Sequence, residues 1–254
     1  MKRALVIFLI AAVLLAVAVG VLAPASIVAP YLERATYGRL AVSEVEGTLW
    51  RGQGVLAAGT ARLPMAWKLD AAHLLAGEAH VHVTPVDGKS PSPRADVMAA
   101  DRHLALSDVV VVVPAAILQQ ALTRTLPVRA GWVVDGEIAA ATSRLEWTPA
   151  AYRGDLRVVW RDARLTLAPA LAIDLGEATA TLAAQGDRLA GPVVNVGGNL
   201  DVRGDVAIGT GGSAAIALLL TPRRADDAEL ARVLAAIGTP DGAGWRVNWQ
   251  TRPQ

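Results

Sequence analysis

Two histidines spaced two residues apart are the first candidates for chemistry in this chain. His80 and His82 form an H-x-H pair in the segment AHVHVTP. Residues i and i+2 of a β-strand share one face, so both imidazoles could reach a single metal ion. His73 and His103 have no spacing that ties them to the pair as a third ligand. We therefore interpret the pair as part of a polar, solvated strand face and expect no metal site.

Three glycine-containing segments imitate nucleotide-binding loops. Residues 87–90 read DGKS, but a phosphate loop needs a glycine five residues before its second glycine, where Val83 stands. Residues 52–57 and 209–214 match G-x-G-x-x-A, a pattern that binds dinucleotides only between a strand and a helix. Both of these segments lead into β-like sequence instead. We interpret all three as turns and expect no nucleotide cofactor.

Signatures of catalysis are missing from the sequence. Cysteine is absent, which excludes a thiolate nucleophile and Cys-ligated zinc. Neither G-x-S-x-G nor H-E-x-x-H occurs. The 24 basic and 23 acidic side chains leave a net charge of +1, without the clustered cations on which nucleic-acid binding depends. We expect a protein that is not an enzyme, with no catalytic residue, no cofactor and no nucleic-acid partner.

The elements that carry these motifs are predicted to be β-strands. Apolar and polar residues alternate in segments 200–203 and 245–250, which is typical of half-buried strands. Turn signals recur between the strands, as in a series of hairpins. They lie at residues 87–88, 135–136, 153–154, 185–186, 197–199 and 209–212. We predict a mostly β fold, with an antiparallel, meander-like domain over residues 39–254 and a polar, Pro-rich insert at 85–96.

Two short helices are predicted within this domain. Residues 114–126 begin with a proline, which the first turn of a helix tolerates, and they carry apolar residues on one side. Residues 225–237 form the better amphipathic pattern, and Gly238 follows as a helix-ending residue. The apolar positions of this second helix are Leu230, Val233, Leu234 and Ile237.

The N-terminal segment predicts where the domain resides. Residues 4–23 are apolar throughout, and as a helix of ~1.5 Å per residue they span roughly the hydrocarbon thickness of a bilayer. Lys2 and Arg3 precede this run, so the positive-inside rule puts residues 1–3 in the cytoplasm. We predict a single transmembrane helix, a linker at 24–38 and a periplasmic domain. A signal peptide cleaved near Ala23-Pro24-Ala25 is the alternative.

One stretch, VEGTLWRGQG at residues 45–54, combines tryptophan with two glycines. We interpret it as a tight turn at Gly47, a short strand carrying Leu49 and Trp50, and a second pivot at Gly52. The chain has seven tryptophans, and core packing is expected for most of them. The candidates for a binding interface are Trp50, Trp245 and Trp249.

Several segments, taken in order, resemble the type II secretion system protein N family, also called general secretion pathway protein N. They are LAPAS (22–26), VEGTLWRG (45–52), W-x-L-x-x-x-x-LLAGEAHVHV (67–83), WRDARL (160–165), NVGGNLDVRGDVAI (195–208) and LAAIGTPDGAGWRVNW (234–249). The resemblance implies a single-pass inner-membrane subunit that has a β-rich periplasmic domain, contacts other secretion subunits and supports export of folded proteins across the outer membrane. The family offers no active-site residues to carry over.

A second function stays open at this point. Long amphipathic meanders also occur in envelope proteins that hold lipid along a curved β groove, and one apolar face per strand would suit acyl chains. Phospholipid is therefore the alternative partner.

Overall fold

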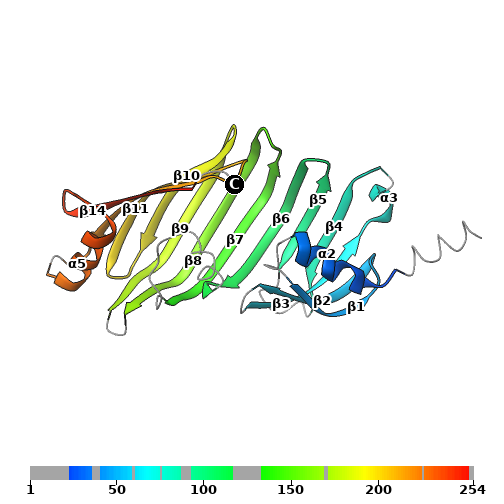
Figure 1. Cartoon of the computed structure of the whole chain (residues 1–254), viewed down its shortest axis with the longest axis horizontal. Coiled ribbons are helices and arrows are strands. Elements are labelled where there is room, and N and C mark those ends of the chain that lie inside the picture. Colours follow the sequence, from blue (N-terminus) through cyan, green and yellow to red (C-terminus); the bar gives the residue numbers. More distant parts are fainter. Residues whose placement is uncertain are drawn as a thin grey trace, which may run out of the picture.

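The computed structural model describes residues 23–35, 41–58, 61–74, 76–86, 93–116, 133–168, 171–224 and 226–251. Within them, fourteen strands form one antiparallel sheet (Figure 1). Each strand from β1 to β12 lies beside its neighbours in sequence, and β14 then lies between β12 and β13. The predicted mostly β, meander-like antiparallel fold is therefore confirmed for this part of the chain.

The strands are β1 (Ala41–Gly47), β2 (Arg51–Ala58), β3 (Ala61–Leu69), β4 (Ala79–Pro85), β5 (Arg94–Ala100), β6 (His103–Pro114), β7 (Val133–Trp147), β8 (Tyr152–Ala168), β9 (Leu171–Gln185), β10 (Arg188–Val196), β11 (Leu200–Gly209), β12 (Ala214–Pro222), β13 (Thr239–Asp241) and β14 (Gly244–Gln250). The helices are η1 (Ala25–Ile27), α2 (Val28–Ala35), α3 (Ala71–Leu74) and α5 (Ala228–Ile237). The pairing of β4 with β5 carries the sheet across the polar insert predicted at 85–96.

The alternation in the sequence gives the sheet two chemically different faces. In β14, Arg246, Asn248 and Gln250 are exposed, and the tryptophans and valine between them are partly buried. The strand registers extend this division from strand to strand. One row consists of the partly buried Leu69, Val81, Val97, Leu106 and Leu145 and the exposed Gly154, on β3 to β8. A second consists of Val111, Ala140, Val158, Ala180, Val193, Gly204, Leu218 and Val247, on β6 to β12 and β14. We call the face that carries both rows the inner face.

Bulges bend the long central strands. The registers of β7 with β8 shift at Gly136 and between Ala141 and Leu145. Gly136 has a φ of +107°, and a Cβ there would lie 2.3 Å from the Arg161 carbonyl oxygen. The turns predicted at 135–136 and 153–154 are therefore wrong, because both glycines lie inside strands and allow a close backbone approach. Turns do occur at the predicted positions 185–186, 197–199 and 209–212.

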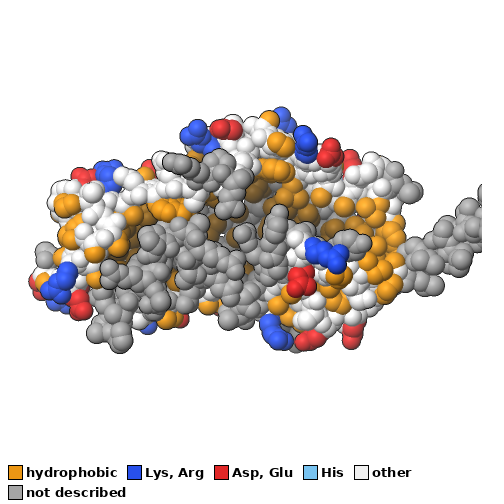
Figure 2. Space-filling view, in the orientation of Figure 1, with side chains coloured by type: hydrophobic (Ala, Val, Ile, Leu, Met, Phe, Trp, Pro, Cys, Tyr) orange, Lys and Arg blue, Asp and Glu red, His pale blue; other side chains and the backbone are white. Residues whose placement is uncertain are grey.

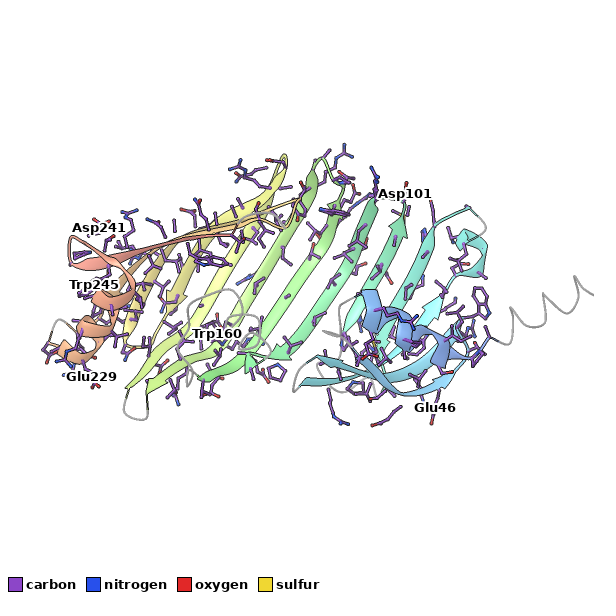
Figure 3. All side chains as sticks on the ribbon, in the orientation of Figure 1. Glu46, Asp101, Trp160, Glu229, Asp241 and Trp245 are labelled. Atoms are coloured by element: carbon purple, nitrogen blue, oxygen red, sulfur yellow. The ribbon has the colours of Figure 1, made fainter. Side chains whose placement is uncertain are left out.

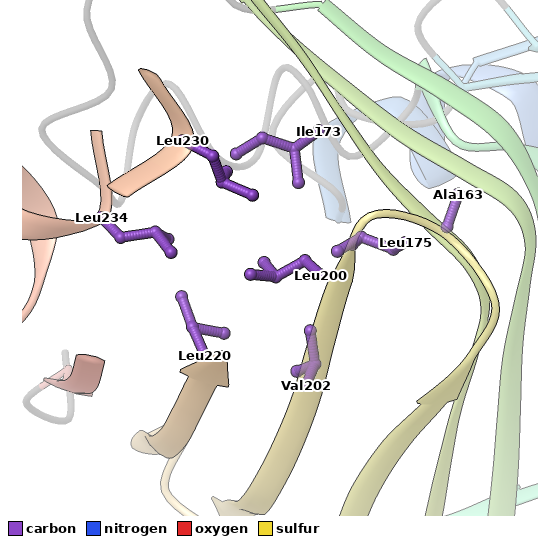
Figure 4. Packing of buried hydrophobic residues seen from close by; sticks show 8 residues of the cluster. All are labelled: Ala163, Ile173, Leu175, Leu200, Val202, Leu220, Leu230 and Leu234. Carbon is purple, nitrogen blue, oxygen red and sulfur yellow. The ribbon is translucent and has the colours of Figure 1, made fainter. Parts of the chain in front are cut away.

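The main core lies where α5 covers one end of the inner face. Leu230 and Leu234 of α5 are fully buried against strands β8, β9, β11 and β12 (Figure 4). The sheet contributes Ala163, Ile173, Leu175, Leu200, Val202 and Leu220. The carboxylate of Asp227 caps the helix by accepting a hydrogen bond from the Leu230 N–H at 3.0 Å. The second predicted helix is confirmed, beginning at Ala228.

The glycine stretch near the N-terminus is a hairpin between β1 and β2. Gly47 ends β1 with a φ of +89°, and Thr48 N–H donates to the Arg51 carbonyl at 2.8 Å. The predicted short strand carrying Leu49 and Trp50 is wrong, because these residues form the hairpin loop. The glycine at position 52, predicted as the second pivot, is required by packing. A Cβ at Gly52 would lie 2.4 Å from the Trp67 indole.

Several expectations fall on residues outside the described ranges. The span predicted at 4–23 does so except for its last residue, and the helix predicted at 114–126 does so from residue 117 onward. Pro114, expected to open that helix, is the last residue of β6. The segment expected as a linker, 24–38, contains η1 and α2, which lies against β1. None of the helices described combines the length and apolarity needed to cross a bilayer.

Candidate interaction surfaces

The inner face is a continuous apolar surface with charged rims. Every residue in the two rows defined above is apolar or glycine. Figure 2, which looks onto this face, shows hydrophobic side chains over much of the surface that it draws in colour and charged side chains along the borders. Figure 3 places Asp101 at one border, and Asp241 and Glu229 at the end that carries α5. Such a surface binds by area rather than by directed hydrogen bonds.

A pocket lies on the inner face near one end of β6, β7 and β8. It has a volume of about 310 Å³ and is lined by Leu104, Leu106, Leu145, Trp147 and Tyr152. Burial raises the pKa of the Tyr152 phenol above its ordinary value of 10.0. The hydroxyl can donate to the Gly209 carbonyl at 3.5 Å, a long contact. The pocket is therefore apolar, with neutral side chains only.

Two polar residues interrupt the core of the inner side. Asn195 is 8% exposed, and its amide is fully engaged by backbone groups. Its Nδ2 donates to the carbonyls of Leu175 at 2.7 Å and Leu200 at 2.8 Å, and the Val202 N–H donates to its Oδ1 at 2.7 Å. Thr142 is 5% exposed, and its hydroxyl has no hydrogen-bond partner. Asn195 thus fastens three strands together, a role that the alternating pattern does not reveal.

His80 and His82 lie on the opposite face, which we call the outer face, and each bonds to a carboxylate. His82 Nδ1 lies 2.5 Å from Asp96 Oδ1, and His80 Nε2 lies 3.2 Å from Glu78 Oε2. His73 stacks on His80 with ring centroids 3.8 Å apart. Among the described residues there is no group of three or more acidic, histidine or cysteine side chains that could hold a metal ion. The H-x-H pair is thus part of a polar face on which each imidazole contacts a carboxylate.

One carboxylate beside the histidines has a perturbed affinity for protons. The pKa of Asp70 is lowered from 3.8, first because the Ala72 N–H donates to its carboxylate at 3.0 Å. Hydrogen bonding to His73 lowers it further, at 3.0 Å. The carboxylate thereby begins helix α3, and these contacts give it a structural role at this turn.

The three tryptophans predicted as interface candidates do not come together. Trp245 and Trp249 share the inner face of β14, and Trp245 packs against the core beneath α5. Trp50 lies in the β1–β2 loop at the other end of the sheet, where its carbonyl accepts from the Leu69 N–H at 2.8 Å. A single contact patch cannot contain all three.

The two edges of the sheet are protected to different degrees. At β1, the register with β2 is interrupted by a bulge, and Glu44 has a φ of 53°. The N-terminal segment also reaches this end, since the Leu49 N–H donates to the Ala23 carbonyl at 2.8 Å. At the other edge, β13 covers only the first residues of β14, Gly244 to Arg246.

The hydrogen bonds to β12 show which backbone groups of β14 point outward. The Thr251 N–H donates to the Ala214 carbonyl at 2.8 Å, so alternate residues, Trp249 and Val247, also bond to β12. The N–H and C=O groups of Asn248 and Gln250 then point away from β12. In the described part of the chain no strand lies beside these two residues. Sequence reasoning missed this edge because sheet order is set by pairing distant in sequence.

Comparison with known proteins identifies a family for this chain. The family model of type II secretion system protein N matches residues 38–248, which covers the whole sheet except its last two residues. No curated protein and no solved structure matches the chain. The family is a component of secretion machinery and not a known family of enzymes. Because the match covers most of the chain, the protein belongs to the family of type II secretion system protein N.

Proposed function

We propose that this protein is an accessory subunit of the type II secretion machinery that acts by protein–protein contacts in the periplasm. The observation that carries the proposal is the family match over residues 38–248. The distribution of charge supports contact rather than catalysis: ion pairs such as Arg203–Asp201 and Arg161–Glu177 lie on the outer face, and the inner face is apolar.

The N-terminal segment supplies the second part of the proposal. Residues 4–23 anchor the chain in the inner membrane, with residues 1–3 in the cytoplasm and the sheet in the periplasm. Anchoring raises the effective concentration of the sheet near other membrane-bound subunits, so contacts of modest affinity suffice.

Gene deletion and complementation test the proposed role. Deletion is expected to reduce secretion of a type II substrate or to lower the level of a sister subunit, and the full chain is expected to restore both. Unchanged secretion together with unchanged subunit levels would contradict the proposal. Export of a protein that uses a different secretion route serves as the control.

The absence of cysteine makes a clean test of topology possible. A Thr181→Cys variant has a single thiol at an exposed position of the outer face. A membrane-impermeant maleimide is expected to label this thiol in cells whose outer membrane has been opened. Labelling only after lysis would refute the periplasmic location. Detection of a mature N-terminus near Ser26 would replace the anchor by a cleaved signal peptide.

A second function is favoured by one observation, the apolar inner face with its pocket. We propose, as the alternative, that this face holds phospholipid acyl chains. The pocket of about 310 Å³ contains no charged group and lies at the lower end of the range of small-molecule sites, roughly 300–1,000 Å³. An acyl chain needs no hydrogen-bond partner, so such a surface suits it.

A charge placed on the inner face separates the two functions. Leu106→Glu puts a carboxylate among Val97 and Leu145, and Thr181→Glu puts the same charge on the exposed outer face of β9 as a control. If lipid is the ligand, phospholipid that co-purifies with the full chain should fall with the first variant only. No bound phospholipid in the wild-type protein would refute this alternative.

A further inference from the structure

We propose that the free edge of β14 accepts an extended segment of another secretion subunit as an added β-strand. The partner's identity rests on the proposed function, whereas the geometry of the edge does not. Asn248 and Gln250 direct two N–H and two C=O groups outward from the sheet, as the bonds of β14 to β12 require. These groups form the hydrogen-bonding template on which strand addition depends.

The position of β13 shows that this edge already accepts a strand. Thr239–Asp241 pairs antiparallel with the first part of β14, and the Thr239 hydroxyl can donate to the Arg246 carbonyl at 3.4 Å. That carbonyl therefore faces the open side, as the alternation demands. Asn248 and Gln250 continue the same row of outward groups where β13 has ended.

Within the residues that the structure describes, the stretch 247–250 shows none of the devices by which sheets usually prevent strand addition. Such devices are bulges, prolines, charged side chains and covering helices. The edge at β1 has a bulge, Glu44 and Glu46, and α2 lies against it. Residues 247–250 read VNWQ, without charge or proline, and their register with β12 is unbroken. The contrast between the two edges indicates that this one is kept open for pairing.

The side chains of β14 define the chemistry of the added segment. Val247 and Trp249 face the inner side, and Asn248 and Gln250 face the outer side. An added strand places its alternate residues beside these, so the partner segment has apolar residues on the inner side and uncharged polar residues on the outer side. Trp249 provides the large apolar contact that such interfaces commonly use.

A different subunit fits this edge better than a second copy of the chain. Two-fold pairing of β14 with β14 would join only residues 248–250 of each copy, since β13 occupies the preceding positions. In such a pair β13 limits the overlap from both copies, whereas a segment of a different subunit meets β13 on one side only. Pairing of β14 with β1 of another copy meets the bulge and α2 at that edge.

Proline substitution on the full chain tests the edge. Asn248→Pro removes an outward N–H while leaving the inward groups of Val247 and Trp249 bonded to β12, and proline is tolerated on edge strands. Asn248→Thr changes the same side chain but keeps the N–H, so it is the matched control. Both are introduced into cells that lack the gene, and the tagged chain is purified with the secretion subunits that it retains.

We expect Asn248→Pro to retain about tenfold less of the partner subunit and Asn248→Thr to match the wild type, since loss of one or two net hydrogen bonds corresponds to about tenfold in affinity. Equal retention by both variants would overturn the proposal. If deletion abolishes secretion and the Asn248→Pro chain restores secretion fully, strand addition at β14 is refuted and the proposed function stands. If deletion leaves secretion and subunit levels unchanged, the proposed function fails.

Hydrogen exchange gives a second result that needs no substitution. In the wild-type chain alone, the amides of Asn248 and Gln250 should exchange quickly, and those of Val247 and Trp249 should be protected by β12. Addition of the co-purified subunit should slow the first two by at least about tenfold, the factor expected from about one net hydrogen bond. Unchanged exchange would refute strand addition. Protection that arises in the pure chain as its concentration increases would show self-pairing and also refute the proposal.

Discussion

Asn195→Leu is the substitution whose cost follows most directly from the structure. Asn195 is the buried polar side chain that links β9, β10 and β11, with bonds of 2.7 Å to Leu175, 2.8 Å to Leu200 and 2.7 Å from Val202. Leucine has a similar volume, so the change removes the hydrogen bonds without a large change in packing. The three backbone groups that bonded to the amide remain in place and lose their partners.

The magnitude follows from those three groups. A buried polar group without a partner costs about 1–3 kcal/mol, and a buried leucine recovers some of this through its apolar area. We expect a net loss of about 3–5 kcal/mol in the free energy of unfolding. For a chain of this size that corresponds to a decrease in Tm of roughly 6–20 °C. That loss is a large part of the normal stability of a folded domain, about 5–15 kcal/mol.

Urea unfolding of the full chain, followed by tryptophan fluorescence, measures this loss. Asn248→Leu is the matched control, because that asparagine is exposed and has no side-chain bond among the contacts of β14. The control should unfold within about 0.5 kcal/mol of the wild type, as surface substitutions usually do. A free energy for Asn195→Leu within about 1 kcal/mol of the wild type would refute the reasoning, because three orphaned groups cannot cost so little.

Three further substitutions test other parts of the fold. Gly52→Val should destabilise the β1–β2 end by about 1–3 kcal/mol, because the added atoms displace the Trp67 indole. A lower urea midpoint, followed by tryptophan emission, would report this loss. Leu234→Ala should cost about 2–5 kcal/mol by leaving a cavity under α5, measured as a lower urea midpoint at unchanged slope. Because the pKa of Asp70 is lowered from 3.8 in the folded chain, its carboxylate contributes to stability above pH 3.8, and this contribution is lost as the pH falls through the folded pKa. In a plot of stability against pH, Asp70→Asn should therefore show a shallower loss of stability below pH 3.8.

Local periodicity predicted the elements whose stabilising contacts are close in sequence. The 225–237 pattern gave α5 because its apolar stripe and its capping carboxylate lie within the segment itself. The alternation at 245–250 gave β14 and the assignment of its residues to two faces. In both cases the residues that determine the conformation are neighbours in the chain.

Glycines show where local patterns stop being informative. Residues 135–136 and 197–199 both look like turns in the sequence. The chain reverses at 197–199, between β10 and β11, whereas 135–136 lies inside β7. Gly136 is required by the approach of the Arg161 carbonyl, a residue on the next strand. Whether a glycine makes a turn or a bulge depends on what lies opposite, and that contact is not encoded within a short window.

Asn195 was missed for a related reason. It occupies an inner position between valines in VVNVGG, where the alternating pattern expects an apolar residue. A polar residue at such a position is itself a signal, because burial without hydrogen bonds would be costly. Its partners, on β9 and β11, become identifiable only when the strand order is known.

The two surfaces of this molecule differ in how well they can select a partner. The inner face offers apolar area, whose attraction has no direction and favours any apolar ligand of suitable shape. The edge of β14 offers donors and acceptors at fixed spacing, so it discriminates by strand direction, register and side-chain alternation. A secretion subunit that works by contact must distinguish one neighbour from many envelope proteins. Specificity of that kind requires directed bonds, and among the surfaces described it is the edge that supplies them.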